Sequence, residues 1–366
     1  MSQAQILVER ADQISPRKLR WLWRGRIPLG KLTILAGLPG EAKSLATIDI
    51  AARVTTARNY PHSENPLPAS EVLLVAGEDD ADDAIIPRLL AADADLSKVR
   101  ILKAVRQTGL AADRSLRLDL DIAGIRSFLG QHPNIRAIVI DPVSNHLGDI
   151  SMIDEQEVRT ILGSLKEVAS TYEVAVICVM HLNKKEGLSA IHRVGGAGAF
   201  IGVARASWLF ARDPRDPTKR FMMPLKNNYA RESSSLVYRV DETPVSIEND
   251  DVPTPYIKWL DEIDLDVDEI LSAPKKHAQR ADAKEFLGQV LAAGPQDASA
   301  VYAAAEARGI SERTLDRAKK ELGVESRKKG TEGWEWVLPS NQSKSASEGQ
   351  GKVGTVGTLQ PASYRE

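Results

Sequence analysis

The sequence predicts an α/β fold, in which a mainly parallel sheet with an antiparallel extension is followed by a small helical module. Three patterns support this prediction. Long apolar runs alternate with helical patterns in the first half of the chain, shorter strand-like runs without long helices come next, and a helix, a Gly-containing turn and a second helix lie near the end. With 366 residues and 43% hydrophobic content, the chain is long enough for one large core and one smaller module.

The composition excludes several classes of protein. The net charge of -2 gives no global basic field, so any contact with nucleic acid must come from local patches. The single cysteine, Cys178, lies inside an apolar run, which excludes a disulfide framework within the chain and fits a reducing cytosol. No apolar run approaches the roughly 18 residues that a membrane span requires, and no signal peptide is recognisable. We therefore expect a cytoplasmic protein that does not bind membranes.

A strand, a glycine-bearing turn and a helix start come together early in the chain. Residues 32–35 form a short apolar run, and residues 44–57 carry apolar side chains at helical spacing. Between them, residues 37–44 nearly match the phosphate-binding pattern G-x-x-x-x-G-K-[ST]. Backbone N–H groups at a helix start converge on an anion, Lys43 adds charge for the terminal phosphates, and the Ser44 hydroxyl can ligate Mg²⁺. The residues expected to bind ATP are Gly37, Leu38, Pro39, Gly40, Glu41, Ala42, Lys43, Ser44 and Leu45.

One position departs from this pattern, because its second glycine is Ala42. The added methyl group matters if the backbone there needs a positive φ or lies against the phosphate. We expect the change to be tolerated, since Gly37 and Gly40 remain to make the bend. The alternative is an ordinary strand-turn-helix unit with an exposed lysine, so the interpretation depends on what the rest of the chain supplies.

Three further strands are predicted, and each ends at a polar residue that could take part in chemistry. They cover residues 71–77, 135–140 and 174–180. The polar residues that follow them are Glu78, Asp141 and His181. Because the carboxyl ends of parallel strands meet at one edge of a sheet, these side chains should converge near Lys43.

Nucleotide hydrolysis needs a metal near the phosphates, a group that orients or deprotonates water, and positive charge for the transition state. Asp141 would hold Mg²⁺ through water, with a turn-forming Asp before Pro142 as the alternative. Pro142 takes the place that often carries the catalytic glutamate, so Glu78 is the expected base; it could also belong to a solvated acidic turn. His181 would sense the γ-phosphate, or would simply cap a strand end.

The antiparallel extension is predicted from shorter runs that no long helices separate. These runs cover residues 206–210, 220–225, 235–240 and 256–259. Arg205 and Lys226 lie beside them and are candidates for the charge that completes a neighbouring subunit's site. Each could equally be an ordinary surface residue.

Two basic regions are candidates for contact with DNA. A Gly-rich loop follows His181 directly, so the nucleotide state could alter its grip on DNA phosphates through Lys184, Lys185 and Arg193. A plain mobile loop is the alternative. The last helix of the C-terminal module offers Arg313, Arg317 and Lys320, in a patch that Asp316 and Glu321 interrupt. Helix, Gly-containing turn, helix and closing hairpin match a winged helix-turn-helix, a module that binds DNA and also docks proteins.

These patterns divide the chain into five parts. They are a flexible N-terminus at residues 1–16, an ATPase domain at 17–262, a linker at 263–281, the winged helix-turn-helix module at 282–338 and a disordered tail at 339–366.

Residues 17–240 resemble the RecA-like P-loop ATPases, and most closely the hexameric replicative helicases of broad-host-range plasmids, the RepA type. The matching stretches are residues 37–44, 76–80, 138–142, 180–184 and 195–208. The resemblance implies a homo-oligomeric ring with ATP at each interface, Glu78 as catalytic glutamate, His181 as sensor and Arg205 as an arginine finger acting in trans. Loops in the central hole would contact single-stranded DNA, and the C-terminal module could contact duplex DNA.

The residues Lys226, Asn227 and Asn228 resemble the Lys-x-Arg trans element of related ring helicases, but Asn228 replaces the arginine and shifts weight to Arg205. We therefore predict a DNA-stimulated ring ATPase, a replicative helicase or helicase-like factor of a mobile element. An ATP-gated DNA-binding regulator with weak hydrolysis is the alternative that Ala42 and the helix-turn-helix suggest. A small-molecule kinase would share the phosphate loop, but no acceptor site or lid is evident.

Overall fold

The structure is a computed structural model of the chain. The residues that it describes are 6, 8–64, 67–106, 112–152, 154–182, 198–230, 233–265, 267, 270, 283–292, 294–308, 310–328 and 333–339. The chain divides into two compact units, Met1–Lys276 and His277–Glu366. The predicted DNA-contacting residues Lys184, Lys185 and Arg193 lie outside the described residues, as do most of the predicted linker and the tail after residue 339.

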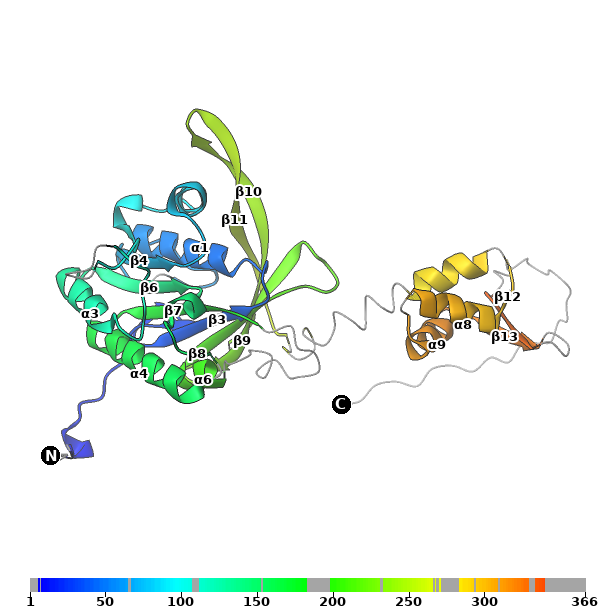
Figure 1. Cartoon of the computed structure of the whole chain (residues 1–366), viewed down its shortest axis with the longest axis horizontal. Helices are drawn as coiled ribbons and strands as arrows, with labels where there is room; N and C mark the ends of the chain where they lie inside the picture. Colours follow the sequence, from blue (N-terminus) through cyan, green and yellow to red (C-terminus); the bar gives the residue numbers. More distant parts are fainter. Residues whose placement is uncertain are drawn as a thin grey trace, which may run out of the picture. The chain divides into compact units, whose positions relative to one another are not determined.

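A large mixed sheet forms the centre of the first unit (Figure 1). Its strands are β3 (Leu32–Gly37), β4 (Glu71–Ala76), β5 (Val99–Ile101), β6 (Ile135–Asp141), β7 (Ala175–His181), β8 (Ala206–Arg212), β9 (Lys219–Asn227), β10 (Ser235–Ile247) and β11 (Asp250–Ile263). Within the described residues, nine strands pair in the order β11-β10-β9-β8-β3-β7-β6-β4-β5. The pairs from β8 to β5 are parallel, and the pairs from β8 to β11 are antiparallel. The predicted α/β sheet with an antiparallel extension is confirmed.

Helices cover both faces of this sheet, as the apolar strands require. They are α1 (Lys43–Thr56), α2 (Ile86–Ala91), α3 (Ile122–Gln131), α4 (Glu155–Tyr172) and α6 (Gly198–Val203). Helices α1 and α2 pack on one face, and α3, α4 and α6 pack on the other. Successive strand residues alternate between the two cores, so that Ile34 belongs to one and Leu35 to the other. No helix among the described residues is long and apolar enough to span a membrane.

Short elements complete the first unit. They are the helical turns η1 (Ala11–Gln13), η2 (Ala81–Ile85), η3 (Leu96–Lys98) and η4 (Val143–His146), and the paired strands β1 (Trp21–Trp23) and β2 (Ile27–Pro28). The turn η2 has π-helical hydrogen bonding and leads directly into α2. The two elements together form one helical segment, residues 81–91, after Glu78.

The hairpin of β10 and β11 is much longer than the sequence indicates. Its strands have 13 and 14 residues and pair as far as Ile247 and Asp250. Three prolines within these strands argue against continuous pairing in the sequence. In the structure, Pro244 lies opposite Pro253, and the hairpin runs past the edge of the main sheet (Figure 1).

The second unit has its own small core. Residues 283–292 are helical, and they are followed by β12 (Gln296–Asp297), α8 (Ala298–Ala307), α9 (Glu312–Glu321), β13 (Glu325–Lys328) and β14 (Trp334–Val337). The strands pair in the order β12-β14-β13. Leu287, Val301, Leu315 and Trp336 pack together in the core. Helices α8 and α9 and the hairpin of β13 and β14 lie where the sequence predicts helix, helix and closing hairpin. A winged helix-turn-helix stays a prediction.

The predicted DNA-contacting side chains of this unit all lie on α9. Arg313 and Lys320 are exposed, and Arg317 is half-buried. The adjacent Lys319 is used within the unit, because its ammonium lies over the Trp336 ring at 4.1 Å and donates to Ser326 at 2.6 Å. Contact of this helix with DNA stays a prediction.

Candidate nucleotide-binding site

The carboxyl edge of the parallel sheet brings the predicted site residues together. Gly37 ends β3 level with His181 at the end of β7. Asp141 ends β6 level with Ala76 of β4, and the Gly77 N–H donates to the Asp141 carbonyl at 2.8 Å. Parallel pairing thus places Gly77, just past the end of β4, beside Asp141. Glu78 directly follows Gly77.

The phosphate loop between β3 and α1 contains two residues in the left-handed conformation. Gly40 has φ +81°, and Ala42 has φ 58° and ψ 29° at the N-cap of α1. Glycine adopts this conformation without cost, whereas an alanine pays about 1–2 kcal/mol. Gly37 is required for space, since a Cβ there would lie 2.5 Å from the Phe210 carbonyl oxygen. The bend therefore includes Ala42, and its methyl group is a source of strain.

Lys43 is buried against the loop that precedes it. Its ammonium donates to the carbonyl oxygens of Gly37 at 3.0 Å and Leu38 at 2.9 Å, and lies 3.3 Å from Nδ1 of His181. Burial lowers the pKa of Lys43 to about 8, although the carboxylates of Asp141, Glu41 and Glu78 act in the opposite direction. The ammonium is thus desolvated and positively charged at neutral pH, which suits it to bind a phosphate.

Asp141 and Ser44 provide a set of oxygen atoms that fits Mg²⁺. Burial raises the pKa of Asp141 to about 6, and a hydrogen bond from the Ser44 side chain partly counters this effect. A desolvated carboxylate beside a hydroxyl is the kind of donor set that Mg²⁺ takes when phosphate and water complete its shell. Ser44 and Asp141 also line a cavity of about 100 Å³ with Thr47, Glu78 and Asp79.

His181 lies between Lys43 and Glu78. Its Nε2 is 3.9 Å from the nearer Glu78 carboxylate oxygen, and its Nδ1 faces the Lys43 ammonium. Because the ammonium can only donate, Nδ1 must accept and Nε2 must carry the proton of the neutral ring. Burial and the charge of Lys43 lower the pKa of His181, which favours this neutral form. The imidazole therefore joins the predicted base to the phosphate-binding lysine.

Two arginines that the sequence argument missed approach the same loop. Nε of Arg212 and Nε of Arg220 each lie 3.8 Å from Oε2 of Glu41. Burial raises the pKa of Glu41, and the two arginines act against that rise. The register of β8 with β9 pairs Arg212 directly with Arg220, and no local sequence pattern gives that register.

Arg205 and Lys226 lie elsewhere. The Arg205 N–H bonds to the carbonyl of Leu32 at 3.4 Å, where β3 begins, so the exposed Arg205 lies at the sheet edge opposite the phosphate loop. Lys226 donates to the last carbonyl oxygens of α6, Ile201 at 2.9 Å and Gly202 at 3.1 Å. Lys226 therefore contacts the C-terminal end of α6, and its role toward a neighbouring subunit stays a prediction.

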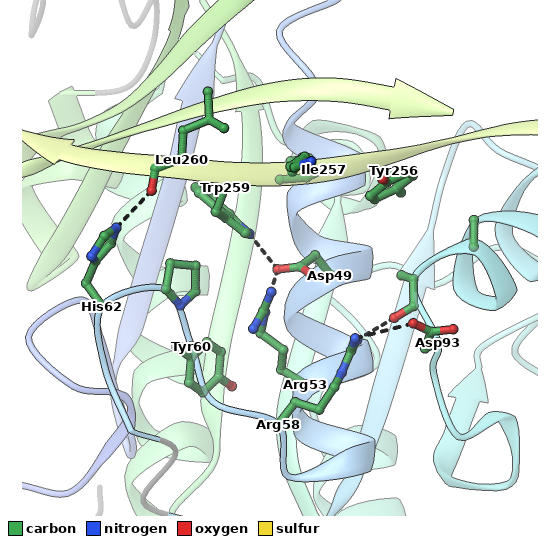
Figure 2. A pocket seen from close by; sticks show the side chains of 14 residues that line it. Asp49, Arg53, Arg58, Tyr60, His62, Asp93, Tyr256, Ile257, Trp259 and Leu260 are labelled. Atoms are coloured by element: carbon green, nitrogen blue, oxygen red, sulfur yellow. Dashed lines mark hydrogen bonds and ion pairs between the residues drawn. The ribbon is translucent and has the colours of Figure 1, made fainter. Parts of the chain in front are cut away.

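A second cavity, of about 490 Å³, lies toward the other end of α1 (Figure 2). There Asp49 accepts hydrogen bonds from Arg53 and from Trp259, each at 2.8 Å. Arg58 pairs with Asp93 across the cavity. Arg53 follows Lys43 by ten residues, which is about 15 Å along a helix, so this cavity is separate from the phosphate loop.

The fold and the site together define the class of protein. A parallel sheet with a Gly-bearing phosphate loop, a lysine at the helix start and a carboxylate at the end of a neighbouring strand characterises P-loop ATPases. The sequence profile of the family described as AAA domain matches residues 2–187, and the chain belongs to that family. The family match supports nucleotide binding and hydrolysis in general. No curated protein matches the chain.

Proposed function

We propose that the chain is a Mg²⁺-dependent RecA-like ring ATPase that works on DNA, as a replicative helicase or helicase-like factor of a mobile element. The observation that carries the ATPase part is the convergence of Lys43, Asp141 and Glu78 at one edge of the sheet. The family match supports the same part. The resemblance to RepA-type helicases supports the ring and the DNA.

The site residues have separate roles in this proposal. Lys43 binds the terminal phosphates and keeps their charge close to the loop. Ser44 and Asp141 would hold Mg²⁺, which when bound neutralises developing charge on the phosphate oxygens. Glu78 orients water and accepts its proton. Its carboxylate lies at the open side of the site, where it is 58% exposed and can reach a water molecule.

His181 supplies a route from the nucleotide to the following loop. It accepts from Lys43 and presents its Nε2–H toward Glu78, so a phosphate that draws the ammonium away changes both contacts. The next residue, Leu182, donates its backbone N–H to the Gly37 carbonyl at 3.1 Å. Loss of the γ-phosphate would thereby alter the anchor of the loop that carries Lys184 and Lys185.

The remaining cations are assigned to neighbours and to DNA. Arg205 is exposed at the opposite edge of the sheet, so in this proposal it serves the site of an adjacent subunit. Arg193 and the two lysines of the loop after Leu182 contact single-stranded DNA in the ring. The second unit acts as a winged helix-turn-helix that uses Arg313, Arg317 and Lys320 on duplex DNA.

The test is ATP turnover with and without single-stranded DNA, run beside light scattering for the state of assembly. We expect turnover to rise with DNA, and to disappear in Lys43→Ala and Glu78→Gln. Lys166→Ala, which removes an exposed lysine from α4, is the matched control and should keep full turnover. Turnover by an obligate monomer that ignores DNA would rule the proposal out.

A second function is favoured by one observation. Ala42 has the strained left-handed backbone where the phosphate-binding pattern carries glycine. A strained loop suits an ATP-gated DNA-binding regulator that hydrolyses ATP poorly. In that case Ala42→Gly should raise turnover substantially, and an unchanged rate would count against the regulator.

A further inference from the structure

The phosphate loop is anchored by the antiparallel extension at the residue before Ala42. The Tyr238 hydroxyl on β10 donates to the backbone carbonyl of Glu41 at 2.6 Å. Tyr238 is fully buried, so water does not compete for this hydrogen bond. The carbonyl belongs to the peptide group that joins Glu41 to Ala42. Fixing the orientation of that group restrains the φ angle of Ala42.

Two arginines on the neighbouring strands β8 and β9 hold the Glu41 side chain. Arg212 pairs directly with Arg220, and Arg220 pairs directly with Tyr238, across β8, β9 and β10. Residues that lie opposite each other on antiparallel strands project from the same face of the sheet. The row therefore meets Glu41 as a unit, with both arginine Nε atoms 3.8 Å from its carboxylate. The Glu41 side chain is 11% exposed, so these charges interact with little screening.

The anchor acts at the strained point of the loop. Ala42 has the backbone conformation that costs alanine most and glycine least. It directly precedes Lys43 and is the N-cap of α1, and backbone N–H groups at a helix start can bind a phosphate. A conformation of this kind persists only where the surroundings over-determine it.

We propose that Tyr238 and Arg220 are positioning residues, which hold Glu41 and so keep Ala42 in the left-handed conformation that the loop needs to receive a nucleotide. The inference rests on the nucleotide-binding part of the proposed function. It assigns to the antiparallel extension a task that glycine performs in the common phosphate-loop pattern.

The expected coupling between Tyr238 and residue 42 follows from the populations of the loop conformations. The apparent affinity for a ligand falls with the fraction of protein in the binding-competent conformation. With the anchor in place, the strain of Ala42 is offset and that fraction is high. Without the anchor, the strain of an alanine at position 42 favours other loop conformations, whereas a glycine adopts this one without strain. The anchor should therefore matter for Ala42 and matter little for glycine.

The experiment is a double-mutant cycle in the full-length chain. Tyr238→Phe, Ala42→Gly and the combined variant are compared with wild type for affinity toward a fluorescent ATP analogue with Mg²⁺. We expect Tyr238→Phe alone to weaken affinity about fivefold, as for the loss of one net hydrogen bond. In the glycine background the loss should fall below about twofold.

Two further measurements separate positioning from a general loss of structure. Hydrogen exchange of the backbone amides of residues 38 and 40–44, without nucleotide, should rise in Tyr238→Phe and return in the double variant. Tyr60→Phe is the matched control, because it removes a buried hydroxyl that has no hydrogen-bond partner. It should change neither exchange nor affinity. Arg220→Lys keeps the charge and should retain more affinity than Arg220→Gln.

The outcomes distinguish this inference from the proposed function. Equal losses of affinity in the alanine and glycine backgrounds, or unchanged exchange in Tyr238→Phe, would overturn the anchor. If wild type and Lys43→Ala bind nucleotide equally poorly, the proposed function fails. The exchange measurement, made without nucleotide, would still decide whether Tyr238 holds the loop.

Discussion

The charged groups at the two ends of α1 differ in the contacts that they make. At its start, burial shifts the pKa values of Lys43 and Asp141 toward neutrality, and the Glu41 Oε2 atom has no hydrogen-bond partner. Toward its end, Asp49 accepts from both Arg53 and Trp259 (Figure 2). At the start, backbone carbonyl oxygens hold the Lys43 ammonium, whereas toward the end a cation holds the Asp49 carboxylate.

This difference shows why cavity size is a poor guide to the site. The larger cavity, of about 490 Å³, lies at the end where the charges are paired. The smaller one, of about 100 Å³, lies beside Ser44, Glu78 and Asp141. Groups held with shifted pKa values and incomplete partners are typical of functional sites, because the cost of desolvation is repaid when a ligand binds.

The largest effect should come from Lys43→Met. This substitution keeps the length of the side chain and removes its charge, so ATP turnover should fall by about 100-fold or more, as when a single stabilising donor is lost. Steady-state phosphate release measures the change. Arg53→Leu, the corresponding loss of a cation from the other end, should keep turnover within about twofold of wild type. A similar loss of turnover in both variants would remove the functional difference between the two ends.

Arg53→Leu should instead act on stability. It leaves the Asp49 carboxylate, 8% exposed, with only the Trp259 N–H of the two donors described above. We expect the free energy of unfolding of the first unit to fall by about 2 kcal/mol. Chemical denaturation measures this change. Double substitution of Asp49→Asn and Arg53→Leu should recover part of the loss, because the uncompensated charge is gone. Unchanged stability in the single variant would show that the pairing contributes nothing.

The pH dependence of ATP turnover should come from the groups near Lys43, at the start of α1. Asp141 has a pKa raised to about 6, so in the free protein it is mostly ionised at pH 7 and mostly protonated at pH 5. Because the carboxylate is the form that can hold a cation, kcat/KM for ATP with Mg²⁺ should fall about tenfold between those values. Lys43 stays protonated throughout this range, and the lowered pKa of His181 keeps most of its ring neutral at pH 7. A flat profile from pH 7 to pH 5 would contradict the assignment of Asp141.

Much of this site could be predicted from local sequence, and the reason is its topology. Strands β3, β6 and β7 are continuous apolar runs, and parallel pairing sends their ends to one edge whatever their exact register. The convergence of Lys43, Asp141 and His181 therefore follows from order along the chain. It needs no knowledge of which residues pair.

The anchor of the loop could not be predicted in the same way. Contact of Glu41 with Arg220 and Tyr238 depends on the register of three antiparallel strands, and a shift of one residue would turn these side chains to the other face. The left-handed backbone of Ala42 likewise reflects its surroundings more than its own preference. The length of the extension could not be predicted either. Prolines such as Pro244 argue against a strand in the sequence, but in the structure Pro244 lies within β10, opposite Pro253.

The smallest effect is a gain in stability at the nucleotide end. The folded-state pKa of Lys43 is about 8, below the usual value of 10.5, so folding disfavours the charged form. The cost is fully present below pH 8 and is relieved as pH rises toward 10.5, because there the unfolded chain binds the proton more readily than the folded one. Without nucleotide, the free energy of unfolding of Lys43→Met should therefore exceed that of wild type by on the order of 1 kcal/mol at pH 7. Its advantage should shrink by pH 10, and chemical denaturation at both pH values tests this. A variant less stable than wild type at pH 7 would mean that the ammonium stabilises the empty loop through Gly37 and Leu38, and that this end is paired like the other.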